Sequence, residues 1–527
     1  MQRLHGFHFM LCWALIGGYA HGADTAAPDH VGPRFDVLEY RVEGNTVLGA
    51  TVIEQAVTPL LGPAKALAEV EQARMALEGA YRDAGYASVL VDIPEQKVDS
   101  GVVVLRVVEG KVGRVRVTGA NYFSQEQILR RVPSLALGGV PWFPAVQQDL
   151  GALGRVADRR VLPVMRPGKA AGTLEVDLNV EDHLPLHASL EMNNRYSANT
   201  SRARMNGMLR YDNLWQREHS YALQFQTSPS DMHEVRVVST SYVLPVGQGG
   251  TQLAVYAVTS RSNVAALSDI TVLGRGDIVG LRGIFPLAAG AVWSHSLTLG
   301  VDYKNFQENV TLTGAPTIET PIEYVPFMAQ YAAFGRHYGG ITQFNAGANI
   351  ALRDVGSRQA DFDNKRFKAQ NNYLVLRWDM QRTQDLPVGS ALMLRVDGQF
   401  ADQPLVSNEQ YAAGGADSVR GYLESEQIGD LALHGTLELR GPAVHRLFPN
   451  TPVDVRAHLF WEAAQVRLLD PLPQQQDRFS LSSAGAGIRV KAWKQWNLSL
   501  DAGWPFKDTR NTHSGKLHAH AATSYEF

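Results

Sequence analysis

Cysteine is almost absent from this chain of 527 residues: Cys12 is the only one, and it lies inside the first apolar run. If that run is removed as an export signal, no thiol is left for a disulfide bond or for a cysteine-based metal site. A cysteine-free chain suits an oxidising compartment outside the cytoplasm, where a stray thiol is a liability.

The chain also lacks a strong charge of either sign. Its formal net charge is −3, so no basic field indicates a nucleic-acid partner. The patterns G-x-x-x-x-G-K-[ST], H-E-x-x-H and G-x-S-x-G are all missing. We therefore expect neither an enzyme nor a cofactor. His518 and His520 stand two apart on one strand face, a spacing that can chelate a metal, but no third ligand is evident and we predict no metal site.

Long apolar runs are missing after the first 22 residues. No later stretch of about 18 apolar residues occurs, which excludes a membrane protein built of helices. A membrane β-barrel is not excluded, because alternating side chains keep the mean hydropathy low. The start itself has the features of an export signal: Arg3 is basic, residues 7–20 are apolar, and small residues precede cleavage after Gly22. We predict a signal peptide at 1–22 and a short segment at 23–33.

The region 34–182 mixes helical and strand patterns, and the order of its elements repeats. The sequence RVEG at 41–44 returns 75 residues later as RVTG at 116–119. Each copy has the order strand, helix, helix, strand, strand. This repeat predicts two small α/β modules, module 1 at 34–111 and module 2 at 112–182.

Two features bear on how these modules pack. Residues 65–85 have a helical pattern that ends at Gly85. The side chains expected on one side of this helix are Leu67, Val70, Met75, Leu77 and Tyr81. Module 2 also carries several arginines, which could attract an acidic client; we favour the interpretation that they are solvated surface residues. They are Arg155, Arg159, Arg160 and Arg166.

From residue 183 to 527 the helical period disappears, and about 16 strand-like segments follow one another between turns. In the segment 453–462, for example, Val455, Leu459 and Trp461 alternate with Arg456, His458 and Glu462. A soluble sandwich seldom runs to 16 segments, and it rarely places so much charge in the middle of strands. A barrel with lipid outside and a polar lumen does both. We predict an all-β transmembrane barrel of 16 antiparallel strands at 183–527.

The last residues, KLHAHAATSYEF, also alternate. Tyr525 and Phe527 share one face, while His518, His520 and Glu526 share the other. A strand that ends on a C-terminal aromatic residue is typical of the closing strand of an outer-membrane barrel. We therefore interpret Tyr525 and Phe527 as a signal for the barrel-assembly machinery.

Between two strands of the predicted barrel lies the sequence VRGY, formed by Val419, Arg420, Gly421 and Tyr422. Two strand-helix-helix-strand-strand modules, 16 strands and VRGY between strands 11 and 12 resemble the Omp85 superfamily. Within it, the chain is similar to the two-partner secretion transporters of the TpsB type, the haemolysin secretion/activation proteins. The modules resemble POTRA modules.

The resemblance implies that the VRGY loop folds back into the lumen and that Arg420 meets an acidic residue on the wall. The family has this residue in an F-x-D-x-G motif, and the matching positions here begin at Phe460 and place Glu462 at the acid. Glu replaces Asp and Ala replaces Gly, so Glu438 and Asp379 stay as alternative partners. An arginine can bind a carboxylate through two parallel hydrogen bonds, which fixes a loop tip in one pose.

The implied function is export. The two periplasmic modules would recognise a large exoprotein, a haemolysin or an adhesin, and the barrel in the outer-membrane lipid would pass it out unfolded. The segment 23–33 is too short for the pore helix that many relatives carry, so we expect none. One alternative is an Omp85-type assembly factor that inserts other outer-membrane proteins, although such factors usually have more POTRA modules. A passive porin is a second alternative, but it needs neither modules nor VRGY.

Overall fold

The computed structural model describes the chain except for a few short segments and the N-terminus. The described residues are 34–98, 100–198, 200–247, 249–267, 270–288, 290, 292–310, 318–444 and 452–527. The predicted signal peptide and the segment 23–33 lie outside them. No helix in the described part of the chain is long and apolar enough to cross a membrane.

The chain divides into two compact units. The first consists of Met1–Val115, Ser134–Val146 and Met165–Val176, and the second of Arg116–Pro133, Gln147–Val164 and Asp177–Phe527. The division passes through module 2. Three of its segments, 116–133, 147–164 and 177–182, therefore belong to the same compact unit as the barrel.

Module 1 contains three helices and five strands. Strand β1 (Phe35–Val37) pairs with β3 (Gly62–Lys65), and β2 (Glu39–Glu43), β5 (Val102–Glu109) and β4 (Val89–Asp92) form a sheet in the order β2-β5-β4. The helices are α1 (Ala50–Val57), the 3-10 turn η1 (Thr58–Leu60) and α2 (Leu67–Asp83).

Module 2 repeats the plan of module 1. Its strands are β6 (Lys111–Thr118), β7 (Arg159–Pro167) and β8 (Thr173–Asp182), in the order β6-β8-β7. Its helices are α3 (Gln125–Arg130), η2 (Pro133–Leu135) and α4 (Phe143–Leu153). The predicted fold class, α/β modules preceding a barrel, is confirmed, but module 1 also contains β1 and β3, which the predicted order of elements lacks.

The repeat extends to a specific turn. Gly44 and Gly119 follow the first sheet strand of each module, and both have positive φ angles, 86° and 79°. A Cβ atom at either position would lie 2.4 Å from a backbone carbonyl oxygen of the neighbouring strand, so only glycine fits. The turn then donates N–H groups to an acid at the end of that strand. The N–H of Thr46 lies 2.6 Å from Glu109, and that of Tyr122 lies 2.7 Å from Asp182.

One part of the helix prediction for 65–85 is wrong. Val70, Leu77 and Tyr81 are buried as expected, but Leu67 and Met75 are 66% and 51% exposed. At 100° per residue, Met75 lies about 140° around the helix axis from Val70, which places it off the buried stripe. Leu67 is the first residue of α2 and stands at the exposed end of the helix.

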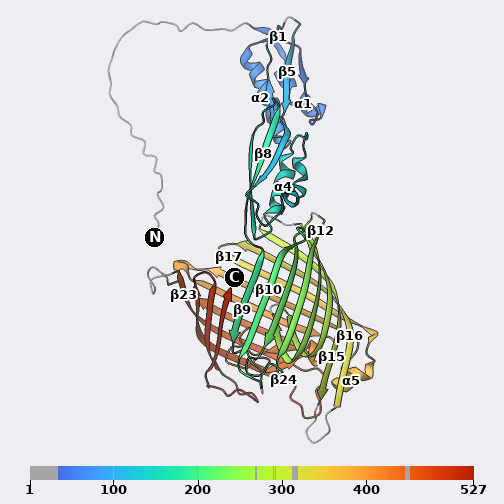
Figure 1. Cartoon of the computed structure of the whole chain (residues 1–527), viewed down its shortest axis with the longest axis vertical. Helices are drawn as coiled ribbons and strands as arrows, with labels where there is room; N and C mark the ends of the chain where they lie inside the picture. Colours follow the sequence, from blue (N-terminus) through green and yellow to red (C-terminus); the bar gives the residue numbers. More distant parts are fainter. Residues whose placement is uncertain are drawn as a thin grey trace, which may run out of the picture. The chain divides into compact units, whose positions relative to one another are not determined.

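Sixteen strands form a closed antiparallel barrel in the described part of the chain (Figure 1), which confirms the predicted fold class. The strands are β9 (Leu186–Asn193), β10 (Arg204–Leu214), β11 (His219–Thr227), β12 (Arg236–Val246), β13 (Thr251–Leu267), β14 (Ile270–Pro286), β15 (Trp293–Val310), β16 (Ile318–His337), β17 (Gly340–Gly356), β18 (Tyr373–Asp385), β19 (Ala391–Ala401), β22 (Leu431–Arg440), β23 (Val453–Arg467), β24 (Arg478–Ala492), β25 (Trp496–Pro505) and β26 (His518–Glu526). The barrel closes where β26 pairs with β9, for example Tyr525 with Leu190.

The alternation along the strands separates an outer face from the lumen. On β23, Leu459 and Trp461 are exposed on the outside, whereas His458, Phe460 and Glu462 are buried on the inside. Because β9 follows module 2 directly, each odd-numbered connection, beginning with β9–β10, lies at the end of the barrel away from module 2. We call this the outer end. The connection β17–β18 contains helix α5 (Gln359–Lys365), and β19–β22 contains β20 (Tyr411–Ala413) and β21 (Gln427–Gly429).

Candidate functional site: a loop inside the barrel

The connection between β19 and β22, residues 402–430, contacts the inner wall of the barrel, and we call it the pore loop. Its two arms pair as β20 and β21, with Tyr411 opposite Gly429. The tip beyond this hairpin, residues 414–426, carries VRGY. Val419 and Tyr422 have no exposed surface, and Arg420 is 4% exposed. The tip therefore lies packed inside the protein and is not a solvent loop.

Arg420 binds three carboxylates from three different strands, and we call these four residues the tip cluster. Glu462 on β23 makes the most contacts with Arg420. Its Oε1 lies 2.9 Å from Nε and 2.6 Å from Nη2 of Arg420, and its Oε2 accepts from the backbone N–H of Arg420 at 2.6 Å. Glu438 on β22 lies 2.8 Å from Nη2. Asp501 on β25 lies 3.1 Å from Nη1. The wall thus holds the guanidinium in a single orientation.

Two further arginines balance the negative charge of the wall. Arg440 Nε lies 2.8 Å from the second oxygen of Glu438, and Arg489 Nη1 lies 2.9 Å from the second oxygen of Asp501. A cavity of about 430 Å³ borders the cluster on the side of these arginines. Three carboxylates and three arginines therefore form a network in which each buried charge has a partner, as low polarity requires.

The ring of Phe460 packs against the guanidinium group of Arg420. Its ring centroid lies 3.6 Å from the guanidinium carbon, a cation–π contact. Phe460 and Glu462 lie two apart on β23 and so point to the same face, while Trp461 between them is 51% exposed on the outside. The structure thus brings the predicted residues Arg420, Phe460 and Glu462 together.

Glycines allow the tip to approach the wall. Gly421 has φ 101°, a conformation that disfavours other residues. Opposite it on β25 lies Gly503, where a Cβ atom would lie 2.7 Å from the nitrogen of Gly421 and 2.8 Å from the carbonyl carbon of Arg420. Tyr422 adds a further contact: its hydroxyl accepts from the N–H of Lys507 at 3.2 Å. Backbone lies directly on backbone here, with no room for a side chain.

The alternative partners of Arg420 divide into one that binds it and one that does not. Glu438 joins the tip cluster, whereas Asp379 accepts a hydrogen bond from Asn345 at 2.6 Å. The sequence reading missed Asp501 and Gly503. The available signal was the sequence LDAGW, which places an acid and a glycine two apart on a strand of otherwise apolar alternation.

The C-terminal residues lie at the seam. Tyr525 is in β26 and its ring packs edge-on against Trp496. Phe527 exchanges two backbone hydrogen bonds with Ala188 of β9, at 2.8 and 3.1 Å. Both side chains are exposed on the outer face. The structure leaves the role of these residues in assembly as a prediction.

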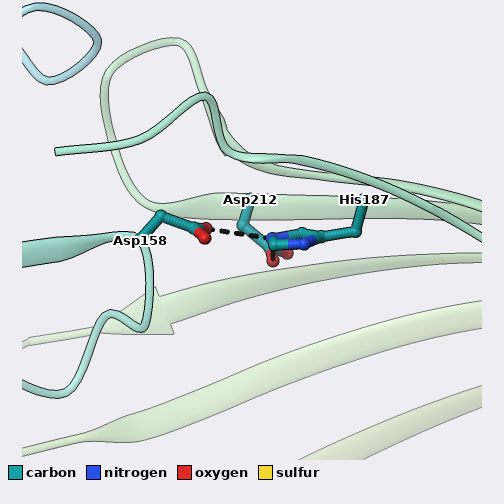
Figure 2. Close-up of side chains that lie close together, drawn as sticks. All are labelled: Asp158, His187 and Asp212. Atoms are coloured by element: carbon teal, nitrogen blue, oxygen red, sulfur yellow. Dashed lines mark hydrogen bonds and ion pairs between the residues drawn. The ribbon is translucent and has the colours of Figure 1, made fainter. Parts of the chain in front are cut away.

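A second polar cluster joins module 2 to the barrel within one compact unit. His187 Nε2 lies 3.0 Å from Asp158 and 3.4 Å from Asp212 (Figure 2). These ligand-type atoms lie within 4.8 Å of one another, so the three residues are the group best able to hold a metal in the described part of the chain. However, Asp212 already accepts from Arg210 at 2.9 Å and from Ser220 at 2.5 Å. An ion-pair cluster accounts for the arrangement without a metal.

The interpretation of the module 2 arginines as solvated is wrong for Arg159. Its side chain is fully buried, lies 4.9 Å over the ring of Phe123 and pairs with Glu218 at 2.9 Å. The pairing residue belongs to the turn between β10 and β11, 59 positions later. Arg159 therefore fastens module 2 to the barrel.

Comparison with known families decides what this barrel is. A model of the ShlB-type POTRA domain matches residues 35–110, and a model of the haemolysin secretion/activation protein ShlB/FhaC/HecB matches residues 172–490, more than half of the chain. The chain belongs to the ShlB/FhaC/HecB family. It is therefore a two-partner secretion transporter of the outer membrane with periplasmic POTRA modules, which exports a partner exoprotein, and it is not an enzyme.

Individual relatives agree with this assignment. The chain is 21% identical over 498 residues to the outer membrane transporter CdiB of Dickeya dadantii, which covers 90% of this chain and 83% of the relative. In fold it is similar to CdiB from Escherichia coli, with a TM-score of 0.65 at 19% identity over 96% of this chain and 93% of that chain. BamA from Haemophilus ducreyi has a TM-score of 0.56 at 14% identity, covering 94% and 100%. Fold alone thus does not separate transporters from BamA.

Proposed function

We propose that the tip of the pore loop, Val419 to Tyr422, obstructs the lumen in the resting transporter and moves when the exoprotein passes. The observation that supports this proposal is the contact of Arg420 with three strands of the wall, which fixes the tip in the lumen. Its bonds are ionic and directional, so they hold one pose, yet they can be exchanged for other polar partners. A moving polar chain offers such partners.

The modules and the C-terminal residues have proposed roles of their own in transport and assembly. We propose that modules 1 and 2, with boundaries near 34–111 and 112–182, recognise the exoprotein in the periplasm. The exoprotein would cross unfolded and be drawn out by its own folding outside, since the outer membrane offers no ATP. The aromatic residues Tyr525 and Phe527 would be read by the barrel-assembly machinery. None of these steps requires a cofactor, a metal or a nucleic acid.

The test is a secretion assay with the large exoprotein encoded beside this protein. Medium and periplasm are blotted for the exoprotein in cells that carry wild type, Arg420→Ala or the control Arg510→Ala. Arg510 is exposed in the outer connection between β25 and β26. Arg420→Ala leaves the loop tip in the lumen without a fixed pose, so the tip no longer yields to the exoprotein in an ordered way. We expect this variant to reduce export at least tenfold with the barrel still in the outer membrane, and the control to export normally. Normal export by Arg420→Ala would refute the role of the loop.

The chain shares its fold with BamA from Haemophilus ducreyi, so a second assay separates the export role from an assembly role. Depletion of the chain distinguishes the two. A transporter leaves the levels of other outer-membrane proteins unchanged, whereas loss of an assembly factor lowers them.

A further inference from the structure

A second charged pair holds the pore loop at its other end. Asp430, the last residue of the loop, has no exposed surface. Its carboxylate accepts hydrogen bonds from Nη1 and Nη2 of Arg366, at 2.5 and 2.7 Å. It also accepts hydrogen bonds from the backbone N–H groups of Leu405, at 3.0 Å, and Leu469, at 2.7 Å. Gln410 donates a further bond at 3.1 Å. Such a carboxylate is fully satisfied by its surroundings and is costly to expose or to leave unpaired.

Arg366 joins three separate outer connections. It lies in the β17–β18 connection, just after α5. Besides Asp430 it donates to the carbonyl oxygens of Leu405 in the pore loop, at 2.5 Å, and of Leu469 in the β23–β24 connection, at 2.9 Å. One guanidinium thus binds residues from the connections 357–372, 402–430 and 468–477. Arginine suits this task because it presents several donors in a rigid plane.

On the side of strands β12 to β19, apolar side chains pack together in the outer half of the lumen. The cluster includes residues of the eight consecutive barrel strands β12 to β19, of α5 and the residues just after it, and of the pore loop. Its members are Val237, Val258, Ile278, Phe306, Ile322, Tyr324, Ala351, Phe362, Ala369, Tyr373, Val375, Ala401, Leu405 and Val406. Phe362 of α5 packs edge-on against Tyr324 with 5.8 Å between ring centroids. A chain passing along strands β12 to β19 would have to displace this packed cluster.

A buried acid of the pore loop adds to the closure. Glu409 is 1% exposed and accepts from Lys304 at 2.5 Å and from the hydroxyl of Tyr324 at 2.8 Å. The loop arm that carries Leu405 and Val406 is therefore fixed to the wall on one side and to Arg366 on the other. Moving the tip alone would leave this arm, and the apolar cluster, in place.

We infer that Arg366 and Asp430 are positioning residues for export: the pair holds the outer end of the lumen closed and must separate before the exoprotein can leave. This inference rests on the proposed function, in which the pore loop moves during transport. It adds a second level of closure, near the outer surface and independent of Arg420. The tip cluster and the outer pair would then open in two distinct steps.

The first experiment measures closure directly. The only cysteine lies in the predicted signal peptide, so Leu405→Cys introduces a single thiol at a buried position of the loop arm. Whole cells are treated with a membrane-impermeant maleimide. We expect little labelling of this variant, and at least a fivefold increase when Arg366→Gln is added. The control is Lys368→Gln, because Lys368 binds Asp470 at 3.4 Å across two of the same connections but both side chains are about half exposed.

The second experiment asks whether the exoprotein needs the opening. Arg366→Cys/Asp430→Cys is prepared in the same chain and joined by a short thiol cross-linker in cells that already export. A heat-modifiability gel verifies that the barrel is folded. We expect cross-linking to reduce export at least tenfold, whereas cross-linker leaves wild-type export unchanged.

Either of two results overturns the inference. Labelling of Leu405→Cys that stays low with Arg366→Gln would show that the pair does not close the lumen. Export that continues after cross-linking would show that the exoprotein does not use this opening. A failure of the proposed function is seen separately, as normal export by Arg420→Ala, because the labelling experiment does not depend on the tip.

Discussion

Arg159 of module 2 and Glu218 of the β10–β11 turn form an ion pair with unequal surroundings. The Arg159 side chain has no exposed surface, and its Nε and Nη1 atoms find no hydrogen-bond partner among the described residues. Glu218 has a second cationic partner, since Arg131 binds its other carboxylate oxygen at 2.5 Å. The buried cation therefore depends on this one carboxylate, while the carboxylate has a second cation.

This asymmetry predicts which partner matters more. Glu218→Gln should destabilise the contact between module 2 and the barrel by about 3–5 kcal/mol, because it leaves the Arg159 charge buried and unpaired. Arg159→Met should cost less, since Glu218 keeps Arg131. The double variant should be more stable than Glu218→Gln alone. Trypsin digestion of the folded chain measures how readily module 2 is released.

The control for this prediction is Glu126→Gln, which changes the same kind of side chain and removes no trypsin site. Glu126 is exposed, and its pair with Arg130 spans 3.9 Å, so its loss should leave the digestion rate unchanged. Equal protection of the double variant and Glu218→Gln would contradict the account.

The barrel, and two of the four residues of the tip cluster, Arg420 and Glu462, could be predicted from the sequence. Alternation on β23 is a local property, so it places Glu462 on the lumen side whatever the rest of the chain does. VRGY combines an arginine with a glycine hinge, and this pattern also needs no distant partner to be noticed. Both features can therefore be recognised from the sequence alone.

Other partners could not be predicted because they depend on how distant segments meet. Asp501 lies 81 positions after Arg420, and its contact requires the barrel to close with β25 beside the loop tip. In the sequence, Arg159 has the features of a surface residue; only the folded structure shows that the turn containing Glu218 covers it. Asp430 is similar: nothing local distinguishes it from a solvated acid at the start of a strand.

The three carboxylates of the tip cluster should differ in importance. Glu462 accepts three contacts from Arg420, whereas Glu438 and Asp501 accept one each. Glu462→Gln should therefore weaken the loop tip by about 3–5 kcal/mol, and Glu438→Gln by about 1.5–3 kcal/mol, the value of one charged hydrogen bond. Asp501→Asn should have the smallest effect on the tip, because its 3.1 Å contact is the longest.

Channel recordings in planar bilayers measure this order as the frequency of opening. We expect Glu462→Gln to open most often, followed by Glu438→Gln and then Asp501→Asn. A matching frequency for all three variants would mean that Arg420 does not distinguish its partners.

Module 2 should lose stability in acid through Asp182. Burial alone raises the pKa of Asp182, but hydrogen bonds from the N–H groups of Tyr122, Phe123 and Asn121 lower it by more, so its pKa lies below the usual range. A carboxyl group whose folded pKa is depressed contributes stability that is complete above its unfolded pKa of about 4. This contribution is lost as the pH falls through the lower, folded value.

Thermal unfolding of the full chain in detergent from pH 7 to pH 2 tests this dependence. Asp182→Asn should lower the melting temperature of the module at pH 7 and show a smaller loss between pH 5 and pH 2 than wild type. Glu181→Gln, at the exposed neighbouring position, is the matched control and should follow wild type. An unchanged acid profile in Asp182→Asn would remove this carboxylate from the explanation.

Gly503 gives a way to displace the loop tip without touching any charge. A methyl group at this position would lie 2.7 Å from the nitrogen of Gly421, closer than any normal contact, and backbone on both sides cannot yield as a flexible side chain would. Gly503→Ala should therefore force the tip from the wall and raise channel opening, while β25 itself accepts alanine readily.

Gly435→Ala on β22 is the control, because its nearest neighbouring atom lies 3.9 Å away. If both variants conduct like wild type, the close backbone contact is not what holds the tip. If only Gly503→Ala opens while Arg420 and its carboxylates are intact, the charged contacts alone do not hold the loop, and close backbone packing is needed beside them.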